Sequence, residues 1–168
     1  VLDGTLYAGT AEGGDGATGR VFSYDPNEGW LDCGSPDDSN AVTAMAVLDG
    51  SLYVGTSFYR KSGSLLPDSV NTTPGGVVHR YVPGDGSWVS CGRIDPENRF
   101  AVNLEKSGMR SAACESVGAL VLHGGHLYAT PPYSEGLFRF DGGVTWTPRR
   151  PPRVRALALA SPSPASAG

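Results

Sequence analysis

The chain has 168 residues, which is long enough for one ordinary domain with a sizeable core. Its 24 Gly and 13 Pro, together with a hydrophobic fraction of 39%, favour many short strands and tight turns over helices or disorder. The formal net charge of -4 gives no general attraction to nucleic acid or to an anionic membrane, so we expect neither as a partner. No apolar run reaches the roughly 18 residues of a membrane span, and three Cys are too few for a disulfide scaffold.

One phrase recurs along the chain and indicates β-hairpins. It is short at residues 2–10, LDGTLYAGT, and complete in VTAMAVLDGSLYVGT, where two alternating apolar runs flank Asp49-Gly50. A second complete copy, VGALVLHGGHLYATP, is centred on Gly124-Gly125. Asp-Gly or Gly-Gly between such runs is typical of a two-residue hairpin. Each complete copy therefore predicts a pair of antiparallel strands.

Two further runs follow each copy of the phrase. The first is apolar and aromatic, at residues 19–25, 76–82 and 136–141. The second contains one of three evenly spaced Trp, at residues 29–34, 86–92 and 144–148. A repeated unit of four antiparallel strands is typical of a propeller blade, because a lone sheet cannot bury both of its faces. We therefore predict an all-β fold, a partial, open β-propeller of about three four-stranded antiparallel blades.

The repeats set the expected boundaries. Residues 1–34 form blade one without its first strand, 35–92 form blade two, and 93–148 form blade three with a long leading loop. Residues 149–168 hold the opening strand of a fourth blade, followed by a low-complexity tail. Since propellers usually have four to eight blades, we expect a fragment or an open remnant of a larger propeller. Missing blades or self-association would then cover its exposed end faces.

A short motif in the third unit resembles a known repeat. Asp141-Gly142-Gly143-Val144-Thr145-Trp146 matches the D-x-G-x-T-W core of the Asp-box found in sialidases and other BNR-repeat propellers. A weaker copy surrounds Asp25, with Asn27 in place of the Gly, and the copy in the second unit lacks the Asp at its usual place. The Gly-rich turns and the Tyr and Trp landmarks are also similar to kelch and galactose-oxidase-like propellers.

The resemblance implies structural duties for the residues of the motif. In the resembled families the Asp-box lies away from the catalytic centre, so Asp25 and Asp141 are expected to form turns by accepting backbone hydrogen bonds. Trp30, Trp88 and Trp146 are expected to cover the edges of their blades. All five are therefore assigned to structural turns and not to sialidase activity.

Two long insertions form the predicted binding face. The first insertion (57–74) and the second insertion (93–116) leave an antiparallel blade on the face opposite the tight turns. Long loops on a rigid scaffold commonly bind ligands, and aromatic and charged residues suit a protein surface or a glycan. The alternative is that both are solvated insertions. The candidate binding residues are Phe58, Tyr59, Arg60, Arg99, Phe100 and Arg110.

No catalytic or metal-binding set stands out. A sialidase-like site would need an arginine cluster, a Tyr activated by a Glu and an acidic proton donor, and no motif selects them. The arginine-bearing F/Y-R-I-P motif is only faintly similar to Gly92-Arg93-Ile94-Asp95-Pro96. Copper chemistry would need Tyr, His and Cys from several blades, and His123 and His126 have no further ligands nearby. We predict no catalytic residues, no cofactor and no metal.

Cysteine and tyrosine recur at framework positions. Cys33 and Cys91 hold the same place in adjacent units and are expected to be unpaired, buried, small apolar groups. Cys114 is either free or paired with Cys91. Tyr7, Tyr53 and Tyr128 are expected in the core.

These patterns predict a non-catalytic binding or scaffold module that recognises a protein or a glycan through the two insertions. One alternative is part of a sialidase-like glycoside hydrolase whose catalytic residues lie mostly outside this chain. Another is a structural half-ring that completes itself by self-association.

Overall fold

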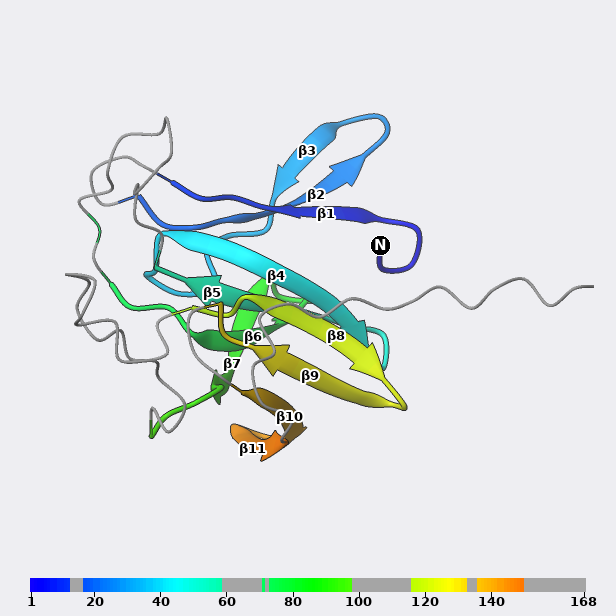
Figure 1. Cartoon of the computed structure of the whole chain (residues 1–168). Helices are drawn as coiled ribbons and strands as arrows, with labels where there is room; N and C mark the ends of the chain where they lie inside the picture. The colour runs from blue at the N-terminus through cyan, green and yellow to red at the C-terminus, as the bar shows by residue number, and fades with distance from the viewer. Residues whose placement is uncertain (13–16, 59–70, 72, 98–115, 133–135, 150–168) are drawn as a thin grey trace, which may run out of the picture.

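The structure is a computed structural model that describes residues 1–12, 17–58, 71, 73–97, 116–132 and 136–149. Its regular elements are β-strands, which pair antiparallel in three sheets (Figure 1). The prediction of an all-β fold built from antiparallel sheets is confirmed. Within the described ranges, no helix has the length and apolar character needed to cross a membrane.

The first sheet has three strands in the order β1-β2-β3. They are β1 (Leu6–Gly9), β2 (Val21–Asp25) and β3 (Gly29–Asp32). Tyr24 on β2 lies opposite Leu6 on β1 and opposite Trp30 on β3. Because residues directly opposite one another point to the same side, these three side chains share one face of the sheet.

The second and third sheets each have four strands in chain order. The second contains β4 (Ala41–Leu48), β5 (Ser51–Ser57), β6 (Val77–Val82) and β7 (Ser87–Arg93). The third contains β8 (Ala119–His123), β9 (His126–Thr130), β10 (Leu137–Gly142) and β11 (Thr145–Arg149).

Both four-stranded sheets open with a hairpin at the place that the repeated phrase predicts. Asp49 and Gly50 join β4 to β5, and Gly124 and Gly125 join β8 to β9. All four residues have positive φ. A two-residue type I′ turn requires this backbone conformation, which Gly adopts without strain and Asp tolerates. The turn sequence therefore sets the register of both hairpins.

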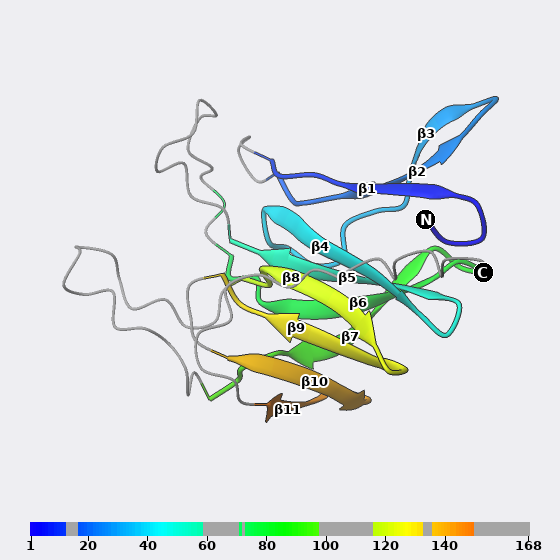
Figure 2. The same ribbon diagram turned by 45° about the vertical axis from the view of Figure 1, so that its right-hand side comes forward.

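The sheets are stacked face to face, with the second sheet in the middle (Figures 1 and 2). Side chains alternate along a strand, so β5 directs Leu52 and Val54 to the first sheet and Tyr53 to the third. The core between the first two sheets contains Leu2, Val21, Val42, Leu52 and Val54. The core between the second and third sheets is larger and contains Val78, Ile94, Val117, Leu120, Leu127, Ala129, Phe138 and Trp146, among others.

Two glycines allow neighbouring sheets to approach closely. A Cβ added to Gly9 would lie 2.7 Å from Cγ1 of Val42, and one added to Gly55 would lie 2.5 Å from Cγ1 of Val117. Gly9 and Gly55 occupy the same place in the copies LYAGT and LYVGT. The glycine of the repeated phrase therefore leaves room for a Val at the start of the next sheet.

Candidate functional site

The stems of the two insertions meet at Thr56. Its carbonyl oxygen accepts hydrogen bonds from the backbone N of Gly76 at 2.8 Å and of Val117 at 3.1 Å. The backbone N of Ile94 donates in turn to the carbonyl oxygen of Gly76 at 3.2 Å. Gly76 and Val117 follow the two insertions, and Ile94 lies at the start of the second. The insertions are therefore anchored at one shared place, which we call the loop-bearing end.

Further contacts fix the same stems. Nη1 of Arg93 donates to the carbonyl oxygen of Gly75 at 2.5 Å. Oγ1 of Thr43 on β4 donates to the carbonyl oxygen of Val117 at 2.6 Å. Ser57 and Ser116 form an isolated antiparallel bridge between the two stems. The loop-bearing end thus has a hydrogen-bonded base on the second sheet.

A partly buried carboxylate supports this base. Asp37, in the connection from β3 to β4, accepts hydrogen bonds from Oγ1 of Thr56 at 2.7 Å and from the backbone N of Ser39 at 2.9 Å. Its Oδ2 lies 3.0 Å from Nε2 of the buried His79. Burial opposes ionisation of Asp37, but the hydrogen bonds from His79, Ser39 and Thr56 outweigh it and lower its pKa to about 2. The carboxylate is charged at neutral pH.

The Asp37 cluster has a structural role, because its contacts with Thr56 and His79 join separate segments of the scaffold. Thr56 lies near the end of β5, His79 lies on β6, and Asp37 belongs to the connection that leaves the first sheet. Sequence reasoning missed this cluster. Asp37 and His79 are far apart in the chain, and no motif singles out either residue.

Asn71 lies in the first insertion and is held to the connections of the first sheet. Its Nδ2 donates to the carbonyl oxygens of Ala17 at 2.9 Å and Asp38 at 2.8 Å. Its own carbonyl oxygen accepts a hydrogen bond from Nδ2 of Asn40 at 3.2 Å. The loop-bearing end therefore extends from the second sheet to the connections of the first.

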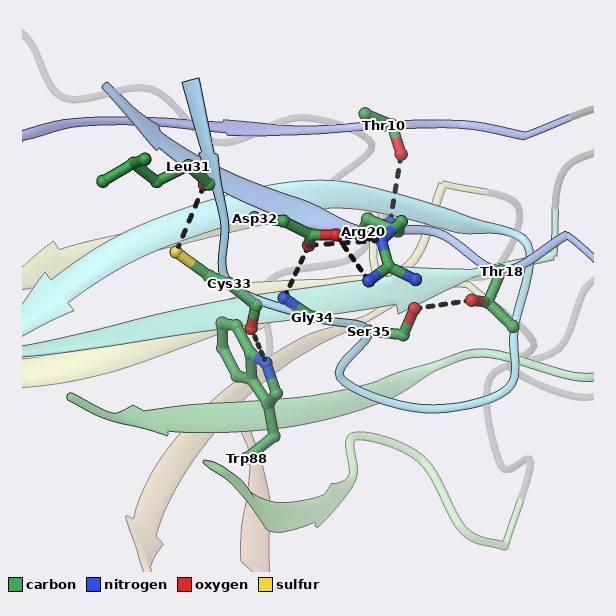
Figure 3. A network of polar contacts seen from close by, with 9 residues as sticks. All are labelled: Thr10, Thr18, Arg20, Leu31, Asp32, Cys33, Gly34, Ser35 and Trp88. Atoms are coloured by element: carbon green, nitrogen blue, oxygen red, sulfur yellow. Dashed lines mark hydrogen bonds and ion pairs between the residues drawn. The ribbon is translucent and has the colours of Figure 1, made fainter. Parts of the chain in front are cut away.

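A second recurring arrangement joins neighbouring sheets through a Trp. Nε1 of Trp88 on β7 donates to the carbonyl oxygen of Cys33, just after β3, at 2.9 Å (Figure 3). Nε1 of Trp146 on β11 donates to the carbonyl oxygen of Cys91 on β7 at 2.8 Å. We call each of these contacts an indole joint. Both satisfy a donor and an acceptor that stacking removes from water.

The Cys33 end of the first indole joint is also held within its own sheet (Figure 3). Arg20 forms an ion pair with Asp32, the last residue of β3, with Nη2 and Oδ2 2.6 Å apart. Oδ1 of Asp32 accepts a hydrogen bond from the backbone N of Gly34 at 2.8 Å. These contacts bracket Cys33 and orient its carbonyl oxygen toward Trp88.

Each Trp also packs on the aromatic ring opposite it in its own sheet. The ring centroids are 5.3 Å apart for Tyr24 and Trp30, 4.8 Å for Tyr81 and Trp88, and 5.0 Å for Phe140 and Trp146. Trp146 is buried and Trp88 half-buried, whereas Trp30 is exposed. The three Trp therefore share one local packing but differ in whether another sheet covers them.

Asp25 and Asp141, the two carboxylates that the sequence assigns to turns, make different contacts. Oδ1 of Asp25 accepts hydrogen bonds from the backbone N of Asn27 at 2.7 Å and of Glu28 at 3.0 Å, and these bonds lower the pKa of Asp25. Asp141 instead binds the side chains of Arg139 and Thr147. Asp25 has the backbone contacts expected of a turn residue, while Asp141 links β10 to β11.

The candidate binding residues fall mostly outside the described residues. Phe58 is described and lies half-buried directly after β5. The five others, which are Tyr59, Arg60, Arg99, Phe100 and Arg110, lie outside, as do residues 150–168 with the expected fourth-blade strand. Their grouping on one binding face remains a prediction.

The structure describes two of the three cysteines. Cys33 and Cys91 are free thiols, Cys91 is buried, and burial raises the pKa of its thiol. Cys114 lies outside the described residues. Of the framework tyrosines, Tyr53 is buried, and Tyr7 and Tyr128 are half-buried.

His123 and His126 are both exposed beside the β8–β9 turn. In the part of the chain that the structure describes, no group of three or more His, Cys, Asp or Glu is placed to hold a metal ion. The sequence matches no family model and no curated protein significantly. A functional assignment therefore rests on the stacked sheets, the indole joints and the loop-bearing end.

Proposed function

We propose that the three sheets are successive blades of a partial β-propeller, akin to BNR/Asp-box or kelch-like repeats. The chain is then a non-catalytic binding or scaffold module that presents its loop-bearing end to a protein or a glycan. The repeated indole joint supports this arrangement, since one contact relates the first sheet to the second and the second to the third. Between the second and third sheets, the first strands β4 and β8 make extensive contact, while the last strands β7 and β11 make little. Sheets that fan out from a common axis would show this difference.

The single observation that carries the binding role is the meeting of both insertions at Thr56. A hydrogen-bonded base of this kind holds long loops on a rigid scaffold, which is where binding residues are commonly found. The insertions supply Arg60, Arg99 and Arg110, whose guanidinium groups suit acidic glycans or carboxylate-bearing protein surfaces. Tyr59 and Phe100 add aromatic surface for stacking on a sugar ring or an apolar side chain.

Replacement of residues 59–70 with a Gly-Ser linker of equal length tests this role, because it leaves Thr56 and Asn71 in place. The probes are printed arrays of sialylated and neutral glycans and of tiled peptides. We expect the unaltered chain to bind at least one probe class and the replacement to weaken that binding at least about tenfold, with unchanged circular dichroism. The matched control replaces residues 83–85 in the β6–β7 turn, at the opposite end of the sheet. Binding to neither array, or binding that survives the replacement, would contradict the proposal.

A further inference from the structure

The first sheet carries an exposed apolar triplet on the face that points away from the second sheet. Leu6, Tyr24 and Trp30 lie directly opposite one another across β1, β2 and β3. Their exposed fractions are 47%, 42% and 52%. A contiguous apolar patch of large side chains commonly marks an interaction site.

The other two sheets show what covers such a triplet. The equivalent residues are Leu52, Tyr81 and Trp88 in the second sheet and Leu127, Phe140 and Trp146 in the third. They pack in the cores against the first and the second sheet, respectively. Leu127 is 0% exposed and Trp146 is 8% exposed. In both cases the cover is the preceding sheet. The face that covers is the one opposite to that sheet's own triplet position, and we call it the far face. The same preceding sheet supplies the carbonyl oxygen of an indole joint.

The third sheet has a far face of the same kind. Val121 on β8 lies opposite Tyr128 on β9, so both share a face. This face is opposite to that of Leu127, which packs on the second sheet. Tyr128 is equivalent to Tyr7 and Tyr53, which line the covering faces of the first and second sheets.

The third sheet also offers an acceptor for a further indole joint. Arg149 follows Trp146 at the same spacing at which Cys33 follows Trp30 and Cys91 follows Trp88. Cys33 and Cys91 are the residues whose carbonyl oxygens accept the two indole N–H groups. The main-chain carbonyl of Arg149 therefore stands at the acceptor position of the next joint, whatever its side chain.

We propose that the Leu6, Tyr24 and Trp30 face docks on the far face of the third sheet of a second copy of this chain. Nε1 of Trp30 donates to the carbonyl oxygen of Arg149 in that copy, as Trp146 does to Cys91 within the chain. The contact is head-to-tail, because it uses two different faces of each copy. Two copies joined at both ends bring six sheets into one ring, which lies within the usual range of four to eight blades. The inference rests on the proposed stacking of blades and is independent of binding through the insertions.

Sedimentation equilibrium of the full chain over a range of micromolar concentrations tests the docking. We expect an average mass that rises with concentration toward twice that of the monomer. Trp30→Glu places a charge in the contact and should raise the dissociation constant at least about tenfold. Trp30→Phe retains an aromatic ring but lacks the indole N–H donor, so it should weaken association less than Trp30→Glu does. Val89→Ser, at an exposed apolar residue of the second sheet, is the matched control and should leave the mass unchanged.

Mixing two blocked variants tests the head-to-tail geometry. Trp30→Glu blocks one face and Tyr128→Glu the other, so each variant alone should stay monomeric while an equimolar mixture forms a one-to-one complex through the two intact faces. Replacement of residues 59–70 should leave association unchanged, which separates this inference from the proposed binding role. A chain that is monomeric throughout, association that survives Trp30→Glu, or a mixture that fails to pair would each overturn the proposal.

Discussion

The indole of Trp146 donates one hydrogen bond that links two sheets, and its acceptor, the carbonyl oxygen of Cys91, lies in the core. A satisfied hydrogen bond contributes about 0.5–1.5 kcal/mol to stability, whereas a buried group left without a partner costs about 1–3 kcal/mol. Trp30 carries the same group on an exposed face. These two residues therefore allow the joint to be measured against a position that lacks it in the isolated chain.

Trp146→Phe should lower the free energy of unfolding by about 1–3 kcal/mol, because Phe retains a ring but leaves the Cys91 carbonyl without its donor. Trp30→Phe, the matched control, should change stability by less than about 0.5 kcal/mol. Urea titrations followed by far-ultraviolet circular dichroism measure both at a concentration where the chain is monomeric. Equal effects of the two substitutions would show that the indole joint contributes nothing.

Asp37 makes stability depend on pH. Its pKa is lowered from 3.8 to about 2 in the folded chain, so the stabilisation is complete above the unfolded value and is lost as the pH falls from about 4 to about 2. Asp37→Asn should therefore cost about 1–2 kcal/mol at neutral pH, after allowance for partial solvent exposure, and the cost should shrink in that acid window. Asp38→Asn, at the exposed neighbour, is the control. Thermal unfolding of wild type and Asp37→Asn measures this cost at pH 6 and in the acid window. A difference in stability between the two proteins that is the same at both pH values would contradict this role.

At the scale of the element, glycine in the repeated phrase sets how closely two sheets approach. Gly55→Ala adds a Cβ at 2.5 Å from Val117, and such overpacking typically costs about 1–3 kcal/mol. Gly84→Ala is the control, since a Cβ there meets nothing within 4 Å. Val117→Gly removes both the Cβ and the Cγ1 that lie 2.5 Å from the added Cβ, so chemical denaturation should show that the double variant Gly55→Ala with Val117→Gly is more stable than the two single effects predict. Strict additivity would mean that the two residues do not meet.

The hairpins could be predicted from the sequence, whereas the contacts between sheets could not. Alternating runs around Asp49-Gly50 and Gly124-Gly125 were enough to predict hairpins, because turn chemistry and strand period are local. The indole joint could not be predicted, since its acceptor is a main-chain carbonyl on another sheet and carries no residue signature. The Asp37–His79 pair was missed for a related reason: only tertiary packing brings the two side chains together.

At the scale of the whole molecule, three sheets stack through one repeated contact. The stems of the two insertions meet at one end of this stack, and among the described residues the outer face of the first sheet carries the exposed triplet. The proposed propeller and its head-to-tail pairing extend the same contact beyond the described residues of one chain.

Hydrogen exchange of the three indole N–H groups, followed by ¹⁵N nuclear magnetic resonance, tests the stacking most directly. The measurement uses Tyr128→Glu, so that self-association cannot shield Trp30, and single Trp→Phe variants assign the three signals. We expect the indoles of Trp88 and Trp146 to exchange at least about tenfold more slowly than that of Trp30, because among the described residues these two donate to a carbonyl of a neighbouring sheet. Three indoles that exchange at the same rate would contradict it.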